Sequence, residues 1–329
     1  MCRVLIPPPE GRGGRDSKRG DEGSRWSLPE RGRRLASGFG AFLWLVLPTT
    51  GHNSYLVGEV QGNSQTVLPD ENFSASVSVV NMAQPRHLPH APITEAVIDL
   101  RAQTAPGLDV QSFANLSEKV GYGEAKEINL FEFGFHQVLG KYPETHQLNH
   151  GRIGFRYVSG DEKYVAQFRK DGFTFSRLAP YTHWDEVFAE ASHLYRVYVE
   201  TANPEEITRI AVRYINRMLL PEEEVKDFSP FLTAPPPFPK ELTAFITGFL
   251  TQVQVQDPGT NIGGTITQTI QQGAGEPGKV PVILDLDIFE LGSKSPEPEA
   301  LLNRFAALRD VKNRYFFSSI TDRTVELYL

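Results

Sequence analysis

Apolar and polar residues alternate along several stretches of the chain, and this alternation predicts β-strands, because successive strand side chains point to opposite faces. In residues 92–101 the charged side chains share one face: Glu95, Asp99 and Arg101. Residues 207–218 have the same alternation, and their charged face is basic: Arg209, Arg213 and Arg217. Each stretch is therefore predicted to be a strand with one apolar and one charged face.

Three shorter alternating stretches, residues 152–158, 164–169 and 173–178, predict an antiparallel meander. Gly172 closes its second turn and can supply the positive φ that a tight hairpin needs. A long helix is expected from about His183, with Thr182 as its N-cap. Its apolar side chains recur every three or four residues and form one stripe: Trp184, Val187, Phe188, Ala191, Leu194, Tyr195 and Tyr198.

After residue 204 the order of elements repeats. Strands are predicted at residues 207–218, 243–256, 262–272 and 280–290, and a second long helix at 298–317. We therefore predict an α+β protein of two similar halves, 82–203 and 204–329, each an antiparallel meander sheet covered by one long amphipathic helix. The pattern leaves open whether the first strand of each half joins its sheet at an edge or across the centre.

Residues 1–81 do not fit this pattern. The first forty are rich in Arg, Gly, Pro, Ser and Glu without any period, a composition that buries little apolar surface. Residues 39–47 resemble a signal peptide, but they start late, lack a cleavage site and are too short to span a bilayer. We favour a mis-annotated, translated upstream region with the true start at Met82. The alternatives are a disordered tail and a membrane-directed leader.

Composition and charge narrow the function classes. The chain has 329 residues, 40% of them hydrophobic and 22% charged, and its net charge of −7 gives no general attraction to nucleic acid. Its one cysteine, Cys2, lies in the doubtful segment, so the body has no thiol nucleophile or cysteine metal site. We expect a cytoplasmic protein with no cofactor and no membrane association.

No G-x-S-x-G, P-loop or G-x-G-x-x-G signature is present. The strongest candidate site is the charged face of the two entry strands, listed above as Glu95, Asp99, Arg101, Arg209, Arg213 and Arg217. If the strands are neighbours, these side chains form cross-strand ion pairs. We favour a structural ion-pair network over the other interpretation, an anion-binding or acid–base floor between the halves.

Two weaker groupings suggest metal ligands. Asp285 and Asp287 share a strand face and could bind Mg²⁺ with a third ligand, although Glu290 is out of phase with them. His146 and His150 would share one face of a helix, but no H-E-x-x-H motif accompanies them. Paired acids on a solvated sheet face and solvated loop histidines are the favoured interpretations, so no metal site is predicted.

Three stretches together carry a family resemblance: F-x-R-L-x-P-Y-x-x-W at 175–184, V-R-Y-I-N-R at 212–217 and L-R-D-V-K-N at 308–313. With residues 92–101 and 316–321, they resemble a sporadically distributed bacterial protein family of unknown function, over about residues 88–329. The resemblance implies no activity. The patchy distribution of that family implies an accessory role, of the defence or toxin–antitoxin type.

Two functions remain open from the sequence. The first is a non-enzymatic binding or interaction module whose sheets form a groove for a small ligand or for a protein, such as one encoded by an adjacent gene. The alternative is an enzyme acting on a phosphate-bearing or nucleotide substrate, through the Arg213/Arg217 and Glu95/Asp99 cluster with metal at Asp285 and Asp287. Neither requires a nucleic-acid partner.

Overall fold

The computed structural model describes the following residues: 2–6, 82–136, 144–224, 227–239, 244–271, 273 and 276–329. Residues 1 and 7–81 are outside this set, so the expectations for the N-terminal segment fall outside the described residues. The chain divides into two compact units, one of Met1–Gly51 with Glu127–Arg152 and one of His52–Lys126 with Ile153–Leu329. Each unit is described by itself. No helix among the described residues combines the length and apolar character needed to cross a bilayer.

The smaller unit consists of paired strands. β1 (Cys2–Ile6) pairs antiparallel with β3 (Lys126–His136), which in turn lies beside β4 (Glu144–Val158). Residues 146 and 150 therefore lie in a strand, neither in the helix considered for them nor in the favoured loop, and residues 126–136 form a strand as well. Phe131, Phe133 and Phe135 alternate with polar or small residues, which is a strand signal within this stretch.

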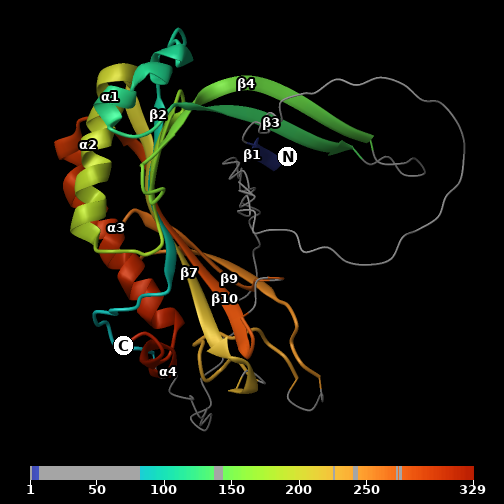
Figure 1. Ribbon diagram of the computed structural model, residues 1–329. Helices are drawn as coiled ribbons and strands as arrows, with labels where there is room; N and C mark the ends of the chain where they lie inside the picture. The colour runs from blue at the N-terminus through green and yellow to red at the C-terminus, as the bar shows by residue number, and fades with distance from the viewer. Residues whose placement is uncertain are drawn as a thin grey trace, which may run out of the picture. The chain divides into compact units, whose positions relative to one another are not determined.

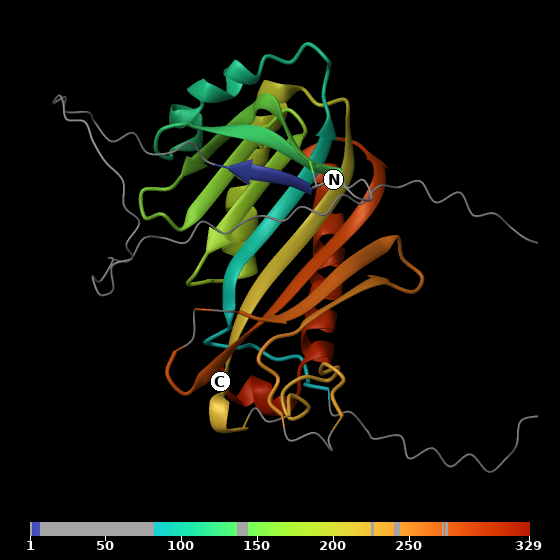
Figure 2. The same cartoon turned by 90° about the vertical axis from the view of Figure 1, so that its right-hand side faces the viewer.

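The larger unit is built on an antiparallel sheet with strand order β4-β5-β6-β2-β7-β10-β9-β8 (Figures 1 and 2). Its strands, besides the end of β4, are β2 (Ile93–Gln103), β5 (Tyr164–Arg169), β6 (Gly172–Leu178), β7 (Glu206–Pro221), β8 (Leu250–Gln256), β9 (Ile262–Ile270) and β10 (Lys279–Lys294). The prediction of an α+β protein with antiparallel strands is confirmed.

The two entry strands lie side by side in the middle of this sheet. β2 pairs with β6 on one edge and with β7 on the other, and Asp99 lies opposite Ala211 while Arg101 lies opposite Arg209. Each entry strand therefore joins the edge of its own meander: β2 lies beside β6, and β7 lies beside β10. Because neighbouring strands alternate in phase, the charged faces of β2 and β7 lie on the same side of the sheet.

The turn between β5 and β6 depends on Gly172. Its φ is +146°, a region that L-residues rarely adopt, and a Cβ there would lie 2.0 Å from the carbonyl oxygen of Leu100. Glycine therefore lets β6 begin directly against β2. The sequence-based prediction of a positive φ at this position is confirmed.

Two long helices, α2 (Trp184–Ala202) and α3 (Pro298–Ser319), lie on one face of the sheet (Figure 1). The short helical segments are η1 (Val110–Asn115), α1 (Ser117–Val120), η2 (Glu222–Glu224) and α4 (Asp322–Glu326). His183, not Thr182, is the N-cap of α2, since its Nδ1 accepts a hydrogen bond from the amide of Glu186. Asn203 ends α2 in a left-handed conformation.

The core lies between these helices and the apolar sheet face. Phe173 of β6 is fully buried, and its ring centre lies 6.0 Å from that of Tyr195 and 6.0 Å from that of Tyr198, both on α2. Ile98 and Val212, from the two central strands, belong to the same buried cluster. Since strand side chains alternate, burying this face leaves the charged side chains of β2 and β7 on the opposite face.

Candidate functional site

Acidic and basic side chains form a chain of ion pairs across the face of the sheet opposite the helices. We call it the charge ladder, and its members are Asp171, Arg169, Arg101, Asp99, Arg209, Asp287, Arg213 and Asp285. They come from β2, β5, β7, β10 and the turn before β6. Four of the six sequence-predicted charged-face residues belong to the charge ladder, which crosses the β2–β7 pair: Asp99, Arg101, Arg209 and Arg213.

Asp99 is the centre of the charge ladder. Its carboxylate accepts hydrogen bonds from Arg209 Nη1 at 3.0 Å, from Arg101 Nε at 3.2 Å and from the Thr174 hydroxyl at 2.6 Å. Arg169 Nη2 lies 3.6 Å from Oδ1, the oxygen that Thr174 binds, whereas Arg101 and Arg209 bind Oδ2. Burial by itself would raise the pKa of Asp99, but the three guanidiniums and Thr174 outweigh it and hold that pKa well below its usual range. Asp99 is therefore charged at neutral pH.

Two arginines of β7 are each bound by a carboxylate of β10. Arg209 Nη2 donates to both oxygens of Asp287 at 2.8 Å, while its Nη1 binds Asp99. Arg213 binds Asp285 through two nitrogens, with Nε 2.9 Å from Oδ1. Two-nitrogen contacts of this kind are the strong form of the guanidinium–carboxylate interaction. The sequence predicted that the two entry strands would form cross-strand ion pairs if they were neighbours. Asp99 of β2 and Arg209 of β7 form such a pair.

Glu95 and Arg217 lie at the margin of the charge ladder. Burial raises the pKa of Glu95, and the hydroxyl of Ser176 and the charge of Arg213 partly oppose that rise. Arg217 donates from Nε to Gln271 Oε1 at 2.8 Å, and its Nη1 lies 3.6 Å from Glu276. The structure therefore does not bring Arg217 into contact with Asp99, and the six predicted residues do not form one site.

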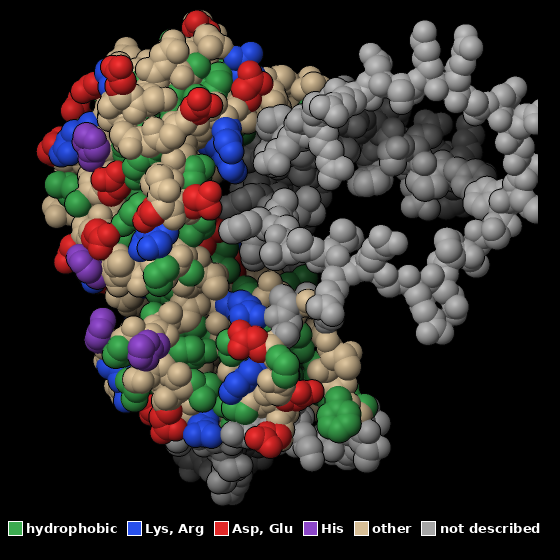
Figure 3. Space-filling view, in the orientation of Figure 1, with side chains coloured by type: hydrophobic (Ala, Val, Ile, Leu, Met, Phe, Trp, Pro, Cys, Tyr) green, Lys and Arg blue, Asp and Glu red, His purple; other side chains and the backbone are tan. Residues whose placement is uncertain are grey.

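The charge ladder is half-open to solvent. The side chain of Arg213 is 33% exposed and that of Asp287 is 29% exposed, whereas that of Asp99 is only 12% exposed. Over the molecular face seen in Figure 3, Lys and Arg are interspersed with Asp and Glu instead of being gathered by sign. Within the charge ladder itself arginines alternate with aspartates, so a ligand bound there would meet charges of both signs.

The structure shows what contacts or spacing the weak metal-ligand candidates have. The carboxylates of Asp285 and Asp287 already accept hydrogen bonds from Arg213 and Arg209. Among the residues that the structure describes, no group of three His, Cys, Asp or Glu side chains could hold a metal ion. Residues 146 and 150 lie in strand β4, where a four-residue separation corresponds to about 13 Å, too far for one ion.

Three residues of the site were missed by the sequence-based reasoning: Arg169, Asp171 and Thr174. Arg169 is buried, and it donates from Nε to Asp171 and from Nη1 to Thr174. All three lie in or beside the β5–β6 hairpin, whose sequence pattern predicted the two strands and the turn but not their ionic contacts. One sequence feature could have pointed to them: the polar residues at 169, 171 and 174 flank a tight turn, as expected for side chains that reach a neighbouring charged strand.

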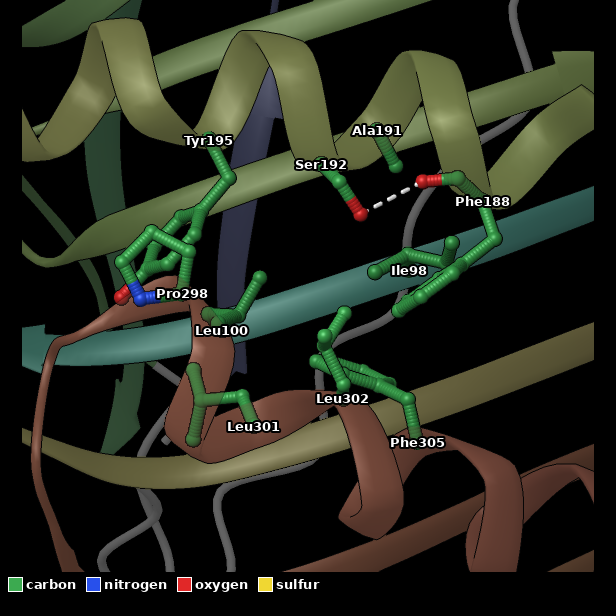
Figure 4. A pocket seen from close by; sticks show the side chains of 10 residues that line it. All are labelled: Ile98, Leu100, Phe188, Ala191, Ser192, Tyr195, Pro298, Leu301, Leu302 and Phe305. Atoms are coloured by element: carbon green, nitrogen blue, oxygen red, sulfur yellow. Dashed lines mark hydrogen bonds between the residues drawn. The ribbon is translucent and has the colours of Figure 1, made fainter.

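A separate cleft lies on the helix side, between α2, α3 and β2 (Figure 4). It has about 300 Å³ of atom-free space, open solvent included, and apolar side chains such as Leu100, Leu301 and Phe305 line it. The hydroxyl of Ser192 donates to the carbonyl of Phe188, so this polar group is already satisfied (Figure 4). The cleft is a packing seam without reactive chemistry.

Comparisons with known proteins find no matching family model, no similar curated protein and no similar solved structure. The resemblance to a sporadically distributed bacterial family therefore stays a prediction.

Proposed function

We propose that the protein is a non-catalytic binding module, and that the charge ladder is its contact surface for a partner protein. The observation that supports this proposal is that the arginines of the charge ladder are already paired with its carboxylates. Arg101, Arg209 and Arg213 are each bound by a carboxylate, and no nucleophile or free acid–base pair stands among them. Such a surface can recognise a complementary charge pattern, but it has no group placed to do chemistry.

The alternating signs favour a polypeptide over a polyanion. A phosphate backbone attracted by Arg213 would also meet Asp285, Asp287 and Glu95 at the same place. A protein surface can present acidic and basic groups together and pair with both signs. A partner encoded by an adjacent gene, as expected from the sequence, fits this requirement.

The alternative, an enzyme acting on a phosphate-bearing or nucleotide substrate, is less well supported. Its phosphate would have to displace Asp285 from Arg213 or Asp287 from Arg209, and each displacement leaves a partly buried carboxylate without its cation. Its metal would need the same carboxylates. We therefore keep this alternative only as an outcome of the test below.

The test measures binding of the adjacent-gene product to the full chain by isothermal titration calorimetry. Asp287→Asn removes one charge from the charge ladder, and Glu200→Gln removes one from the exposed Lys119–Glu200 pair on the helix side. We expect D287N to weaken binding about tenfold or more while E200Q leaves it unchanged, with both variants folded by circular dichroism.

Equal affinities for the two variants, or no binding by the wild type, would overturn the proposal. A rise in melting temperature with nucleotide and Mg²⁺ that disappears in D287N would overturn it in favour of the enzyme. The calorimetric and thermal arms thus separate the two functions.

We propose further that residues 82–329 consist of two similar halves, 82–203 and 204–329, each with its own covering helix. The mirrored strand order supports this: β4-β5-β6-β2 on one side matches β8-β9-β10-β7 on the other. Each half also runs from an entry strand through a meander to a long helix. A cytoplasmic location and an accessory role remain part of the proposal, on the sequence arguments given above.

A further inference from the structure

Helix α3 carries two cations, on the side of the sheet opposite the charge ladder, that have no carboxylate partner among the described residues. Arg309 and Lys312 are three residues apart, so their side chains are neighbours on the helix. Lys312 is only 9% exposed, and its Nζ lies 3.9 Å from the centre of the Tyr214 ring. Arg309 is half-buried with its guanidinium carbon 5.6 Å from the centre of the Trp184 ring. Both cations contact aromatic faces.

Two tyrosine hydroxyls lie beside these cations. The hydroxyl oxygens of Tyr181 and Tyr214 are 3.2 Å apart, and the two rings meet edge to face at 5.7 Å. Burial raises the pKa of both tyrosines, and the positive charge of Arg309 acts in the opposite direction on both. In such a pair one hydroxyl donates to the other, and the second keeps its proton for a ligand.

The groups around Lys312 come from three elements. Tyr214 faces it from β7, Arg309 from α3, and Asn313 accepts a hydrogen bond from its Nζ at 2.6 Å. Asp185, exposed in the first turn of α2, raises the pKa of Tyr181. Within the described part of the chain, no carboxylate lies within ion-pair distance of Arg309 or Lys312. The arginines of the charge ladder, in contrast, are each bound by a carboxylate.

Uncompensated cations at a buried site attract an anion. Taking a cation out of water without a counter-ion is costly, and burial, helped by the charge of Arg309, lowers the pKa of Lys312 to about 7. An oxyanion at this place would receive charge-assisted hydrogen bonds from the amine and the guanidinium, and a further bond from a tyrosine hydroxyl. None of these groups would repel it.

We propose that Arg309, Lys312 and the Tyr181–Tyr214 hydroxyl pair form a binding site for the oxyanion group, carboxylate or phosphate, of a small ligand. The side chains of Tyr181 and Arg309 are half-buried, whereas that of Lys312 is buried. A ligand would therefore reach the site past Tyr181 and Arg309. Three stretches singled out in the sequence, 175–184, 212–217 and 308–313, each supply part of this site. It is independent of the partner surface proposed above, because Tyr214 and Arg213 are adjacent in a strand and point to opposite faces.

The site has a characteristic pH dependence. A bound anion stabilises the protonated amine, so the pKa of Lys312 is higher in the complex than in the free protein. Binding therefore takes up a proton wherever the free amine is neutral, and affinity is highest below the free pKa of about 7. For acetate, whose charge is constant between pH 6 and pH 8, we expect affinity to fall about tenfold over this range, since the protonated fraction of a group titrating near pH 7 falls by about that factor.

The experiment titrates the full chain separately with inorganic phosphate and with acetate at pH 6, 7 and 8, at constant ionic strength set with chloride. Melting temperature reports binding. Lys312→Met keeps the size of the side chain without its charge, and Arg309→Gln changes a half-buried cation whose loss leaves no buried carboxylate behind. Arg196→Gln on α2, which ends an exposed pair with Glu299, is the matched control.

We expect a saturable rise in melting temperature with at least one anion, larger at pH 6 than at pH 8. The rise should disappear in K312M and R309Q and persist in R196Q. The anion that acts identifies the ligand group as phosphate or carboxylate. A rise that survives in both site variants, or no rise in the wild type with either anion, would overturn the proposal. If K312M does not fold, R309Q alone decides.

Discussion

Replacing Asp99 by asparagine removes the negative charge that three guanidiniums share. Arg209 and Arg101 donate to this carboxylate at 3.0 and 3.2 Å, and Arg169 lies 3.6 Å away. Asparagine has nearly the same shape and still accepts the hydrogen bond of Thr174, so the substitution leaves packing intact. The measured change in stability therefore reports the charge and not a cavity.

The expected loss is about 3 kcal/mol in the free energy of unfolding. Breaking a buried ion pair by removing one partner costs about 3 to 5 kcal/mol, because the remaining charge stays buried without compensation. Here the cost lies at the low end. Arg101 is 37% exposed, so water can solvate it, and Arg209 keeps Asp287 as its second partner.

Urea unfolding at pH 7, compared between wild type and D99N, measures this loss. Asp171→Asn is the control, because the Asp171 side chain is 50% exposed, and we expect it to cost less than about 1 kcal/mol. The pKa of Asp99 is lowered by folding, so its contribution is complete above the unfolded carboxyl pKa of about 4 and is lost as pH falls below that. A D99N loss below 1 kcal/mol, or one unchanged at pH 3, would refute the reasoning.

Two further substitutions test the local structure. Gly172→Ala should destabilise the fold by more than about 2 kcal/mol in thermal unfolding, since its Cβ would lie 2.0 Å from the Leu100 oxygen at a φ of +146°. Gly160→Ala, with no neighbour within 4 Å, should change stability by less than about 0.5 kcal/mol, and equal effects would contradict this account. Tyr157→Phe should cost about 1–3 kcal/mol in urea unfolding, because the buried Phe113 carbonyl and Leu116 amide both lose the Tyr157 hydroxyl, whereas a neutral result would show that those groups find other partners.

Local patterns predicted the strands and the long helix better than they predicted the site. The alternation at residues 164–169 gave β5 with the bounds that the structure has, because both of its turns carry clear signals. The charged faces of residues 92–101 and 207–218 were also identified, since a period of two assigns every strand side chain to a face. These inferences needed no knowledge of distant contacts.

The pairing of distant strands could not be predicted in the same way. Nothing in residues 92–101 says that β2 will lie between β6 and β7, because that choice depends on contacts across more than seventy residues of sequence. Arg169 was missed for this reason, since it matters only once β2 is its neighbour across β6. The oxyanion site was missed similarly: Tyr181, Tyr214 and Lys312 come from three separate stretches that only the fold brings together.

The central place of β2 has a consequence for synthesis on the ribosome. About a hundred residues separate the end of β2 from the start of β7, so at 5–20 residues per second β2 waits roughly 5 to 20 seconds for its second neighbour. During that time β6 can cover one edge, while the other edge exposes unpaired backbone groups. A nascent chain that stops near residue 203 would therefore carry an open strand edge. Stalled chains of this length should be the form that aggregates first.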